Sequence, residues 1–417
     1  MATADPQGRK IQEGIAELRS VRRRSRPLFW SVAVFSFFVN ALMLTGPLYM
    51  LNVYDRVLGS RSVETLLALS VLVAFLFAMM GLLDVVRGRV MGRVGARFQA
   101  DLDERVFAAS IRGATMPDVH KEAATAQKDL ESVQRLLVSP ALMAVYDLPF
   151  APLFFFGIFL FHPWMGYLAL VGAGILLSLA VMNQIISRAP LSRASATAHV
   201  AEQMGSQIRQ EAELVLALGM RGAAFSRWQN ARGESLTAAI GATDHTGTFS
   251  SVIKAVRLLL QSAMLGLGAY LVLLNQISAG AMIAGSILLG RALAPIEMIV
   301  GQSSMFQRAR EGWKNLGVLL GYVREGQKRT ALPQPKAKLD VEQATVFLPG
   351  EPTATLRMIS FSVEPGEAVG VIGTSGAGKS TLAKALTGFL SPAAGRVRLD
   401  GAALDQCEPD VLGKYVG

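Results

Sequence analysis

Long apolar runs dominate the chain between residues 28 and 300. A helix needs about 20 consecutive apolar residues to cross the hydrocarbon core of a bilayer, so each such run is a candidate transmembrane helix. Runs of this length occur at 28–50, 63–86, 138–160, 164–186, 254–275 and 279–300. The pattern therefore predicts an α-helical membrane domain that crosses the bilayer six times.

Two kinds of connection group the runs into pairs. Short connections join the members of a pair at 52–62, 161–163 and 275–279. Long polar segments, at about 87–137 and 187–253, separate one pair from the next. This spacing predicts helical hairpins with short turns on one side of the membrane and larger structures on the other.

The long segments are themselves helical in pattern. Residues 96–110 and 196–220 carry apolar residues at helical spacing, with few Gly or Pro. We therefore expect the membrane helices to continue well past the bilayer. Breaks are predicted at 113–118 and 219–223, where the chain could bend or present a short docking helix.

Positive charge is divided unevenly between the connections. The short connections contain only Arg56 and Arg61, whereas the first long segment contains Arg87, Arg89, Arg93, Arg97, Arg105, Arg112, Lys121, Lys128 and Arg135. Cytoplasmic loops of membrane proteins collect Lys and Arg. We therefore expect the long segments and both termini to lie in the cytoplasm.

Composition supports a membrane protein and argues against other classes. Hydrophobic residues make up 51% of the 417 residues and charged residues only 17%, with a mean hydropathy of +0.38. The net charge of +10 does not indicate nucleic-acid binding, because the basic residues are dispersed and lack interleaved aromatics. The single cysteine, Cys407, excludes an intramolecular disulfide, and the four histidines lack metal-ligand spacing.

The N-terminal segment 1–27 is polar and ends in a basic run at 22–26. A secretory signal peptide also begins with basic residues, but its apolar region is short and precedes a cleavage site with small residues. Here the apolar run continues for a full span. The sequence predicts a cytoplasmic segment followed by an uncleaved first transmembrane helix.

The pattern changes after the sixth span. An amphipathic helix is predicted at 305–323, which would end a membrane domain of residues 28–323 with its cytoplasmic extensions. Residues 324–337 are rich in Lys, Arg and Pro, as is typical of a linker. From residue 338 to residue 417 we expect an α/β domain, with strands at 357–363, 368–373 and 395–400.

A phosphate-binding motif lies within this second domain. The pattern G-x-x-x-x-G-K-[ST] is matched in full by Gly373, Thr374, Ser375, Gly376, Ala377, Gly378, Lys379 and Ser380, and Thr381 continues as a helix. Backbone N–H groups of such a loop point into one concavity at a helix N-terminus, which favours phosphate. We expect Lys379 to reach the β- and γ-phosphates and the Ser380 hydroxyl to ligate Mg²⁺. A glycine-rich turn without a ligand is the less favoured alternative.

The residues around this loop resemble the start of an ABC ATPase domain. The resemblance rests on Gly366-Glu367, the phosphate loop, Gly395-Arg396-Val397 and Leu399-Asp400-Gly401. Six spans with long extensions followed by such a domain resemble the ABC exporter family. The stretches at 47–58, 146–152 and 290–295 are similar to permease/ATPases of type I protein secretion systems.

The resemblance implies both fold and function. The fold is a six-helix membrane domain of the ABC exporter type, followed by a partial α/β P-loop nucleotide-binding domain. The function is ATP-driven export of a protein by a homodimer in the bacterial inner membrane, with ATP and Mg²⁺ as cofactors. In type I systems the partners are a periplasmic adaptor (membrane fusion protein), an outer-membrane channel and a secreted protein with a C-terminal signal. Segment 1–27 leaves no room for a peptidase-like domain, so the implied branch exports proteases, lipases or surface-layer proteins.

Two departures from the family pattern affect the nucleotide site. The family stacks adenine on an aromatic residue near the first strand, and Phe347 is the only candidate, with core packing as an equal alternative. The sequence to Gly417 also lacks the glutamine-bearing loop, the signature motif, the catalytic Glu and the switch His. We therefore expect no catalytic residue in this chain, and no ATPase activity from this chain alone.

Ionisable residues in predicted spans are candidates for a functional site. Asp147, Arg257, Arg291 and Glu297 lie within or at the edge of spans. Lining a hydrated path is one interpretation. Snorkelling to an interface, or an interhelical ion pair that fixes packing, is the favoured one.

Two other functions stay open. The first is export of a lipid or drug, against which the stretches at 47–58 and 146–152 argue. The second is a membrane scaffold that binds nucleotide without hydrolysing it.

Overall fold

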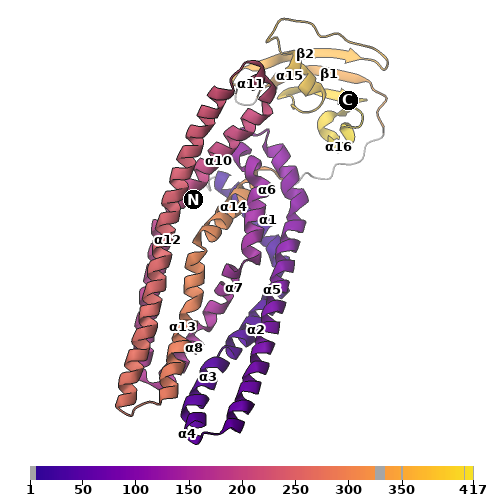
Figure 1. Cartoon of the computed structure of the whole chain (residues 1–417). Helices are drawn as coiled ribbons and strands as arrows, with labels where there is room; N and C mark the ends of the chain where they lie inside the picture. Colours follow the sequence, from indigo (N-terminus) through magenta and orange to yellow (C-terminus); the bar gives the residue numbers. More distant parts are fainter. Residues whose placement is uncertain (1–5, 325–333, 349–350, 408, 417) are drawn as a thin grey trace, which may run out of the picture. The chain divides into compact units, whose positions relative to one another are not determined.

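The computed structural model describes residues 6–324, 334–348, 351–407 and 409–416 (Figure 1). These residues belong to two compact units. The first unit comprises 1–107 and 125–318, and the second comprises 108–124 and 319–417.

Helices build the described part of the first unit, and α5, α6 and α14 continue from it into the second. In chain order the main helices are α1 (Pro6–Arg24), α2 (Arg26–Leu42), α3 (Thr45–Asn52), α4 (Leu58–Ser60), α5 (Val63–Gly113), α6 (His120–Val138), α7 (Pro140–Asp147), α8 (Ala151–Phe161), α9 (Pro163–Ile186), α10 (Arg188–Gln210), α11 (Ala212–Ala217), α12 (Arg221–Leu273), α13 (Ala279–Gly301) and α14 (Ser303–Tyr322). Six helical stretches are long and apolar enough to cross a membrane: Arg26–Ser60, Val63–Gly113, Pro140–Phe161, Pro163–Gln210, Arg221–Leu273 and Ala279–Gly301. The six predicted spans are confirmed, and α14 confirms the predicted amphipathic helix.

Several helices continue far beyond a bilayer. Helix α5 has 51 residues and α12 has 53. At about 1.5 Å per residue α12 extends about 80 Å, whereas the hydrocarbon core is about 30 Å thick. Both predicted breaks are also present: α5 ends at Gly113 before a 3-10 turn (Pro117–Val119), and a turn at 218–220 gives Gly219 a φ of +63°.

Helices α8, α9, α12 and α13 form one hydrophobic core of the first unit. They bury Phe154, Ile158, Met165, Leu260, Leu289 and Leu293. Small residues permit this approach, since a Cβ on Gly172 would lie 2.8 Å from the Cδ1 of Leu260, and one on Gly285 would lie 2.4 Å from the Cε of Met165. Lipid is as apolar as these side chains, so membrane helices associate through such close packing rather than through the hydrophobic effect.

The third span is interrupted, which its apolar pattern did not reveal. Between α7 and α8 the 3-10 turn η3 (Leu148–Phe150) contains Pro149. Proline removes a backbone donor and clashes with the preceding turn, which favours a break in the α-helix at this point.

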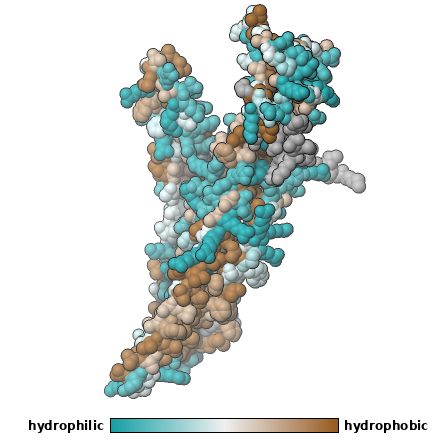
Figure 2. Space-filling view, turned by 90° about the vertical axis from the view of Figure 1, so that its right-hand side faces the viewer, coloured by the Kyte–Doolittle hydropathy of each residue, from teal (hydrophilic) through white to brown (hydrophobic). Residues whose placement is uncertain are grey.

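The outward faces of the span regions are apolar. Leu67 and Phe75 of α5, for example, are 67% and 60% exposed. Figure 2 shows hydrophobic side chains gathered along one stretch of the helices, with hydrophilic ones beyond it. A bilayer or a second membrane subunit is the kind of neighbour that covers such a surface.

The N-terminal segment forms a helix that the sequence did not predict. Helix α1 buries Leu18 and Val21, and Glu17 accepts from the Nε of Arg105 on α5 at 2.8 Å. Amphipathic burial and this ion pair therefore fix α1 on the extension of α5.

The second unit contains a four-stranded sheet of order β2-β1-β3-β4. The strands are β1 (Leu339–Phe347), β2 (Ala354–Val363), β3 (Ala394–Leu399) and β4 (Ala402–Ala403), all paired antiparallel. Helices α15 (Lys379–Leu386) and α16 (Pro409–Leu412) accompany them. The strands predicted at 357–363 and 395–400 are confirmed as β2 and β3.

The strand predicted at 368–373 is wrong. This segment belongs to no sheet, and Val369, Val371 and Ile372 are 57%, 50% and 95% exposed. An extended segment becomes a strand only when a neighbour bonds its N–H and C=O groups, and the sheet of β1 to β4 does not reach it. Apolar character alone could not show whether a partner strand was present.

Candidate nucleotide-binding site

The phosphate loop connects the unpaired segment to α15. Gly376 and Gly378 have φ of +83° and +87°, and Gly378 is the N-cap of α15. Only glycine adopts these angles without strain. A Cβ on Gly378 would also lie 2.9 Å from the Cδ2 of Leu356 on β2, so this position is restricted both in conformation and in space.

The sheet positions the helix that follows the loop. Ala385 of α15 is buried against Val346 of β1 and Leu356 of β2, and Leu382 packs on the same cluster. This packing fixes the N-terminus of α15, where free N–H groups and the helix dipole favour an anion.

Lys379 lies across the loop. Its Nζ donates to the carbonyl oxygens of Gly373 at 2.8 Å and Thr374 at 2.7 Å. The ammonium is therefore held over the concavity where a phosphate would bind. Ser380 is exposed next to it, whereas Thr381 is buried, so the Thr381 side chain contributes to packing.

Phe347 ends β1 and is 41% exposed. Its neighbour Val346 pairs with Leu356, which contacts the position of Gly378. Phe347 is thus on the strand next to the loop with part of its ring free. Adenine stacking on Phe347 stays a prediction.

Asp400 has a role that the sequence did not indicate. Its carboxylate accepts hydrogen bonds from the backbone N–H groups of Lys336, Ala337 and Lys338. It therefore fixes the described end of the linker segment to the turn after β3. In the sequence, the only indication of this role was that the strand predicted before Gly401 ends in Asp400. Nearby, the Glu364 carboxylate bonds to Lys338 Nζ at 2.6 Å and raises the pKa of that lysine.

Three of the four intramembrane charges form interhelical ion pairs. Asp147 bonds to Arg87 at 2.6 Å, and Arg257 of α12 bonds to Glu297 of α13 at 2.6 Å. Arg291 is exposed. The ion-pair interpretation is thus confirmed for Asp147, Arg257 and Glu297. Arg87 had been assigned only to a cytoplasmic segment, and its partner lies 60 residues away in sequence.

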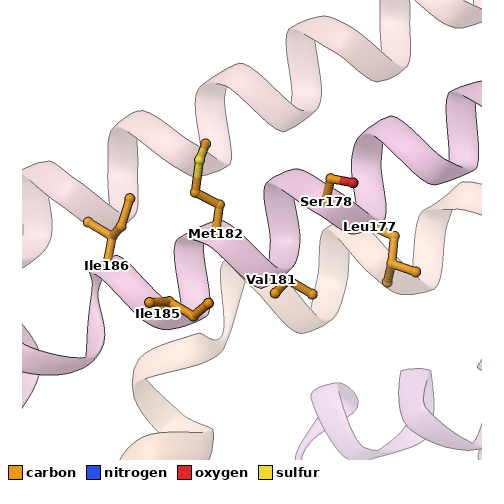
Figure 3. Close-up of a pocket in the computed structure, with 6 residues that line it drawn as sticks. All are labelled: Leu177, Ser178, Val181, Met182, Ile185 and Ile186. Atoms are coloured by element: carbon orange, nitrogen blue, oxygen red, sulfur yellow. The ribbon is translucent and has the colours of Figure 1, made fainter.

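A shallow pocket along α9 does not fit a nucleotide. Its lining residues all come from that helix: Leu177, Ser178, Val181, Met182, Ile185 and Ile186 (Figure 3). None of them carries a charge that would hold a phosphate. The apolar lining is instead suited to lipid tails or to another membrane helix.

Comparison with known families decides the class of protein. The family described as ABC transporter transmembrane region matches residues 29–293, and the family described as ABC transporter matches residues 356–417. This chain belongs to the ABC transporter family. Its helical domain is that of an ABC exporter, and an ABC ATPase domain implies nucleotide binding.

Curated relatives identify the branch that the chain resembles. It is 36% identical over 402 residues to the type I secretion system ATP-binding protein PrsD of Rhizobium meliloti (strain 1021), over 96% of this chain and 69% of that protein. It is 25% identical over 397 residues to the toxin RTX-I translocation ATP-binding protein of Actinobacillus pleuropneumoniae, over 94% of this chain and 56% of that protein. The resemblance to type I secretion permeases is thus confirmed, and the chain spans part of the length of these relatives.

A solved structure shares the fold. A bacterial Atm1-family ABC exporter with ATP bound superposes with a TM-score of 0.71 at 18% identity, over 93% of this chain and 70% of that chain.

Proposed function

We propose that this ABC transporter chain is the permease and nucleotide-binding part of an exporter that uses ATP to move a protein across the bacterial inner membrane. The observation that carries the proposal is the phosphate loop at the N-terminus of α15, on a chain whose membrane domain resembles type I secretion permeases. Both termini face the cytoplasm in this proposal, because the basic residues gather in the long segments.

Residues 373–381 and Phe347 hold the nucleotide. Lys379 leaves its carbonyl partners for the phosphates, and the Ser380 hydroxyl ligates Mg²⁺. Bound Mg²⁺ would neutralise charge that develops on the transferred phosphoryl group. We keep the predicted domains 1–27, 28–323, 324–337 and 338–417 as part of the proposal.

The cytoplasmic turn after α5 supports transmission between the nucleotide and the spans. Residues 108–124 group in one compact unit with 319–417. The side chain of Leu319 approaches the Cβ position of Gly113 to 2.7 Å. Leu319 belongs to α14, the last helix before the linker, so we propose that movement of the nucleotide-binding part reaches the end of α5 through α14.

A homodimer is proposed for the intact exporter. Around α11, Leu214, Leu216, Leu218 and Met220 are exposed at 55%, 68%, 61% and 49%. Such a cluster on a hydrophilic extension supports burial by another protein surface, for which a second copy is our choice. A periplasmic adaptor, an outer-membrane channel and a cargo with a C-terminal signal complete the proposed system. If ATPase activity instead responds to lipid and no adaptor co-purifies, the lipid or drug exporter is the better assignment.

Nucleotide binding by the full chain in detergent tests the site. We expect Lys379→Ala to weaken Mg-ATP binding at least about tenfold, since a hydrogen bond to a charged group contributes about 1.5–3 kcal/mol. Lys384→Ala is the matched control, because Lys384 is exposed on the same helix and contacts Phe389 rather than the loop. Equal binding by both variants would contradict the site.

A measurement of ATP turnover distinguishes nucleotide binding from nucleotide hydrolysis. We propose that the intact exporter hydrolyses ATP and that this chain alone shows no Mg-ATPase activity above background. Turnover of this chain that disappears with Lys379→Ala would refute the second statement.

A further inference from the structure

A buried polar group joins the first three spans. Arg87 of α5 is 5% exposed, and its Nη1 donates to the Oδ1 of Asp147 at 2.6 Å and to the Oγ of Ser36 at 2.9 Å. Its Nε and Nη2 donate to the Oδ1 of Asp84 at 3.1 and 2.7 Å. Asn40 of α2 donates to the same oxygen of Asp147 at 2.9 Å. The group therefore connects α2, α5 and α7.

Asp147 occupies a position that local energetics disfavour. It is the last residue of α7, directly before the 3-10 turn that interrupts the third span. A carboxylate at a helix C-terminus is opposed by the helix dipole, and an ionised group within a span is costly. The Asp147 carboxylate is therefore stabilised by Arg87 and Asn40 rather than by its own helix.

Apolar packing within the chain is sparse along the adjoining part of α5. In the apolar span of α5, no residue is buried within the chain. Further along the same hairpin, the Tyr49 hydroxyl bonds to that of Ser70 at 2.8 Å. At its far end, Asp55 accepts from the N–H of Gly280 at 3.0 Å. The α2–α5 hairpin is thus held largely by a few polar contacts.

We infer that Arg87 and Asp147 are positioning residues for transport, through which the α2–α5 hairpin holds the interrupted third span so that both move as one body. The inference rests on the proposed exporter function. Asp147→Asn removes the ion pair that connects the interrupted third span to α5, while Arg87 keeps Asp84 as a counterion. Arg87→Gln leaves both carboxylates unpaired and has the larger effect.

A distance measurement tests the connection without nucleotide or cargo. In full chain carrying Cys407→Ser, spin labels at Leu82→Cys on α5 and Leu153→Cys on α8 report the separation of the two elements; both leucines are partly exposed. We expect one narrow distribution in the parent and a broadened one in Asp147→Asn and Arg87→Gln. The charge exchange Arg87→Asp with Asp147→Arg, made together with Asp84→Asn so that no second carboxylate faces the new aspartate, should narrow it again. Arg89→Gln, at an exposed neighbouring arginine, is the control.

Export by the intact protein provides the functional measurement. We expect Asp147→Asn to lower export per ATP about tenfold, within the range seen for residues in coupling networks, while Mg-ATP affinity is unchanged. Unchanged distances in Asp147→Asn, or no recovery in the charge exchange, would overturn the inference. Loss of ATP binding in the parent would instead overturn the proposed function and leave the distance result intact.

Discussion

Asp129 illustrates how a single half-buried carboxylate responds to its surroundings. Its Oδ2 accepts from the Thr125 hydroxyl at 2.9 Å and from the Asn315 amide of α14 at 3.1 Å. Burial nevertheless raises its pKa above the usual 3.8, and the negative charge of Glu311 adds to the rise, while His199 opposes it. Loss of hydration therefore outweighs the two hydrogen bonds.

Stability should depend on pH through this residue. Because the pKa of Asp129 is higher in the folded state, its protonated form contributes to the free energy of unfolding. This contribution is fully present below about pH 3.8 and is lost as the pH rises through the folded-state pKa. We expect Asp129→Asn, which keeps an oxygen acceptor, to be more stable than the parent at pH 7 and to lose that advantage towards pH 4. Thermal unfolding across this range measures the difference. Asp103→Asn, at an exposed aspartate, should show none; a less stable Asp129→Asn at pH 7 would contradict the account.

At the scale of elements, the N-terminus of α13 is capped from another hairpin. Asp55 lies in the π-helical turn η1 (Val53–Val57) and accepts from the Ser278 hydroxyl at 2.5 Å as well as from Gly280. A carboxylate at a helix N-terminus is favourable. Gly280 leaves no space for a side chain, since its Cβ would lie 2.7 Å from the Oδ1 of Asp55 and 2.8 Å from the carbonyl oxygen of Leu51.

Adding one methyl group tests this close approach. We expect Gly280→Ala to destabilise the chain by about 1–3 kcal/mol, as overpacking does, because the cap must move. Gly59→Ala is the matched control in the same turn region, where a Cβ would meet nothing within 4 Å. Denaturation in detergent compares them, and equal stability of the two variants would show that the cap yields easily.

Some elements followed from the sequence and others could not. The six spans depend on local hydropathy, and the phosphate loop on a contiguous motif, so both were predictable. The strand predicted at 368–373 failed because strand pairing depends on a neighbour. The break in the third span was not predicted, although Asp147 and Pro149 mark its place in the sequence. The Arg87–Asp147 pair joins residues distant in sequence, and no local pattern announces such a partner.

At the scale of the whole molecule, charge asymmetry predicts which ends of the helices face outward. In a Cys407→Ser background, a membrane-impermeant maleimide should label Ser60→Cys, at the last residue of α4, in intact spheroplasts. It should label Ser226→Cys on the α12 extension only after permeabilisation. Both serines are exposed, so accessibility across the bilayer is the variable compared. Labelling in the opposite order would reverse the proposed orientation.

The length of α12 converts a small tilt at one end of the helix into a large displacement at the other. A straight helix of about 80 Å acts as a lever, so tilting it by about 5° at its outer end displaces the far end by about 7 Å. Shifts of side-chain size at one end of α12 thus correspond to movements larger than a helical turn at the other end. In the proposed exporter, a displacement of several ångströms at the far end of α12 would therefore reach the membrane-spanning part as a rotation of only a few degrees.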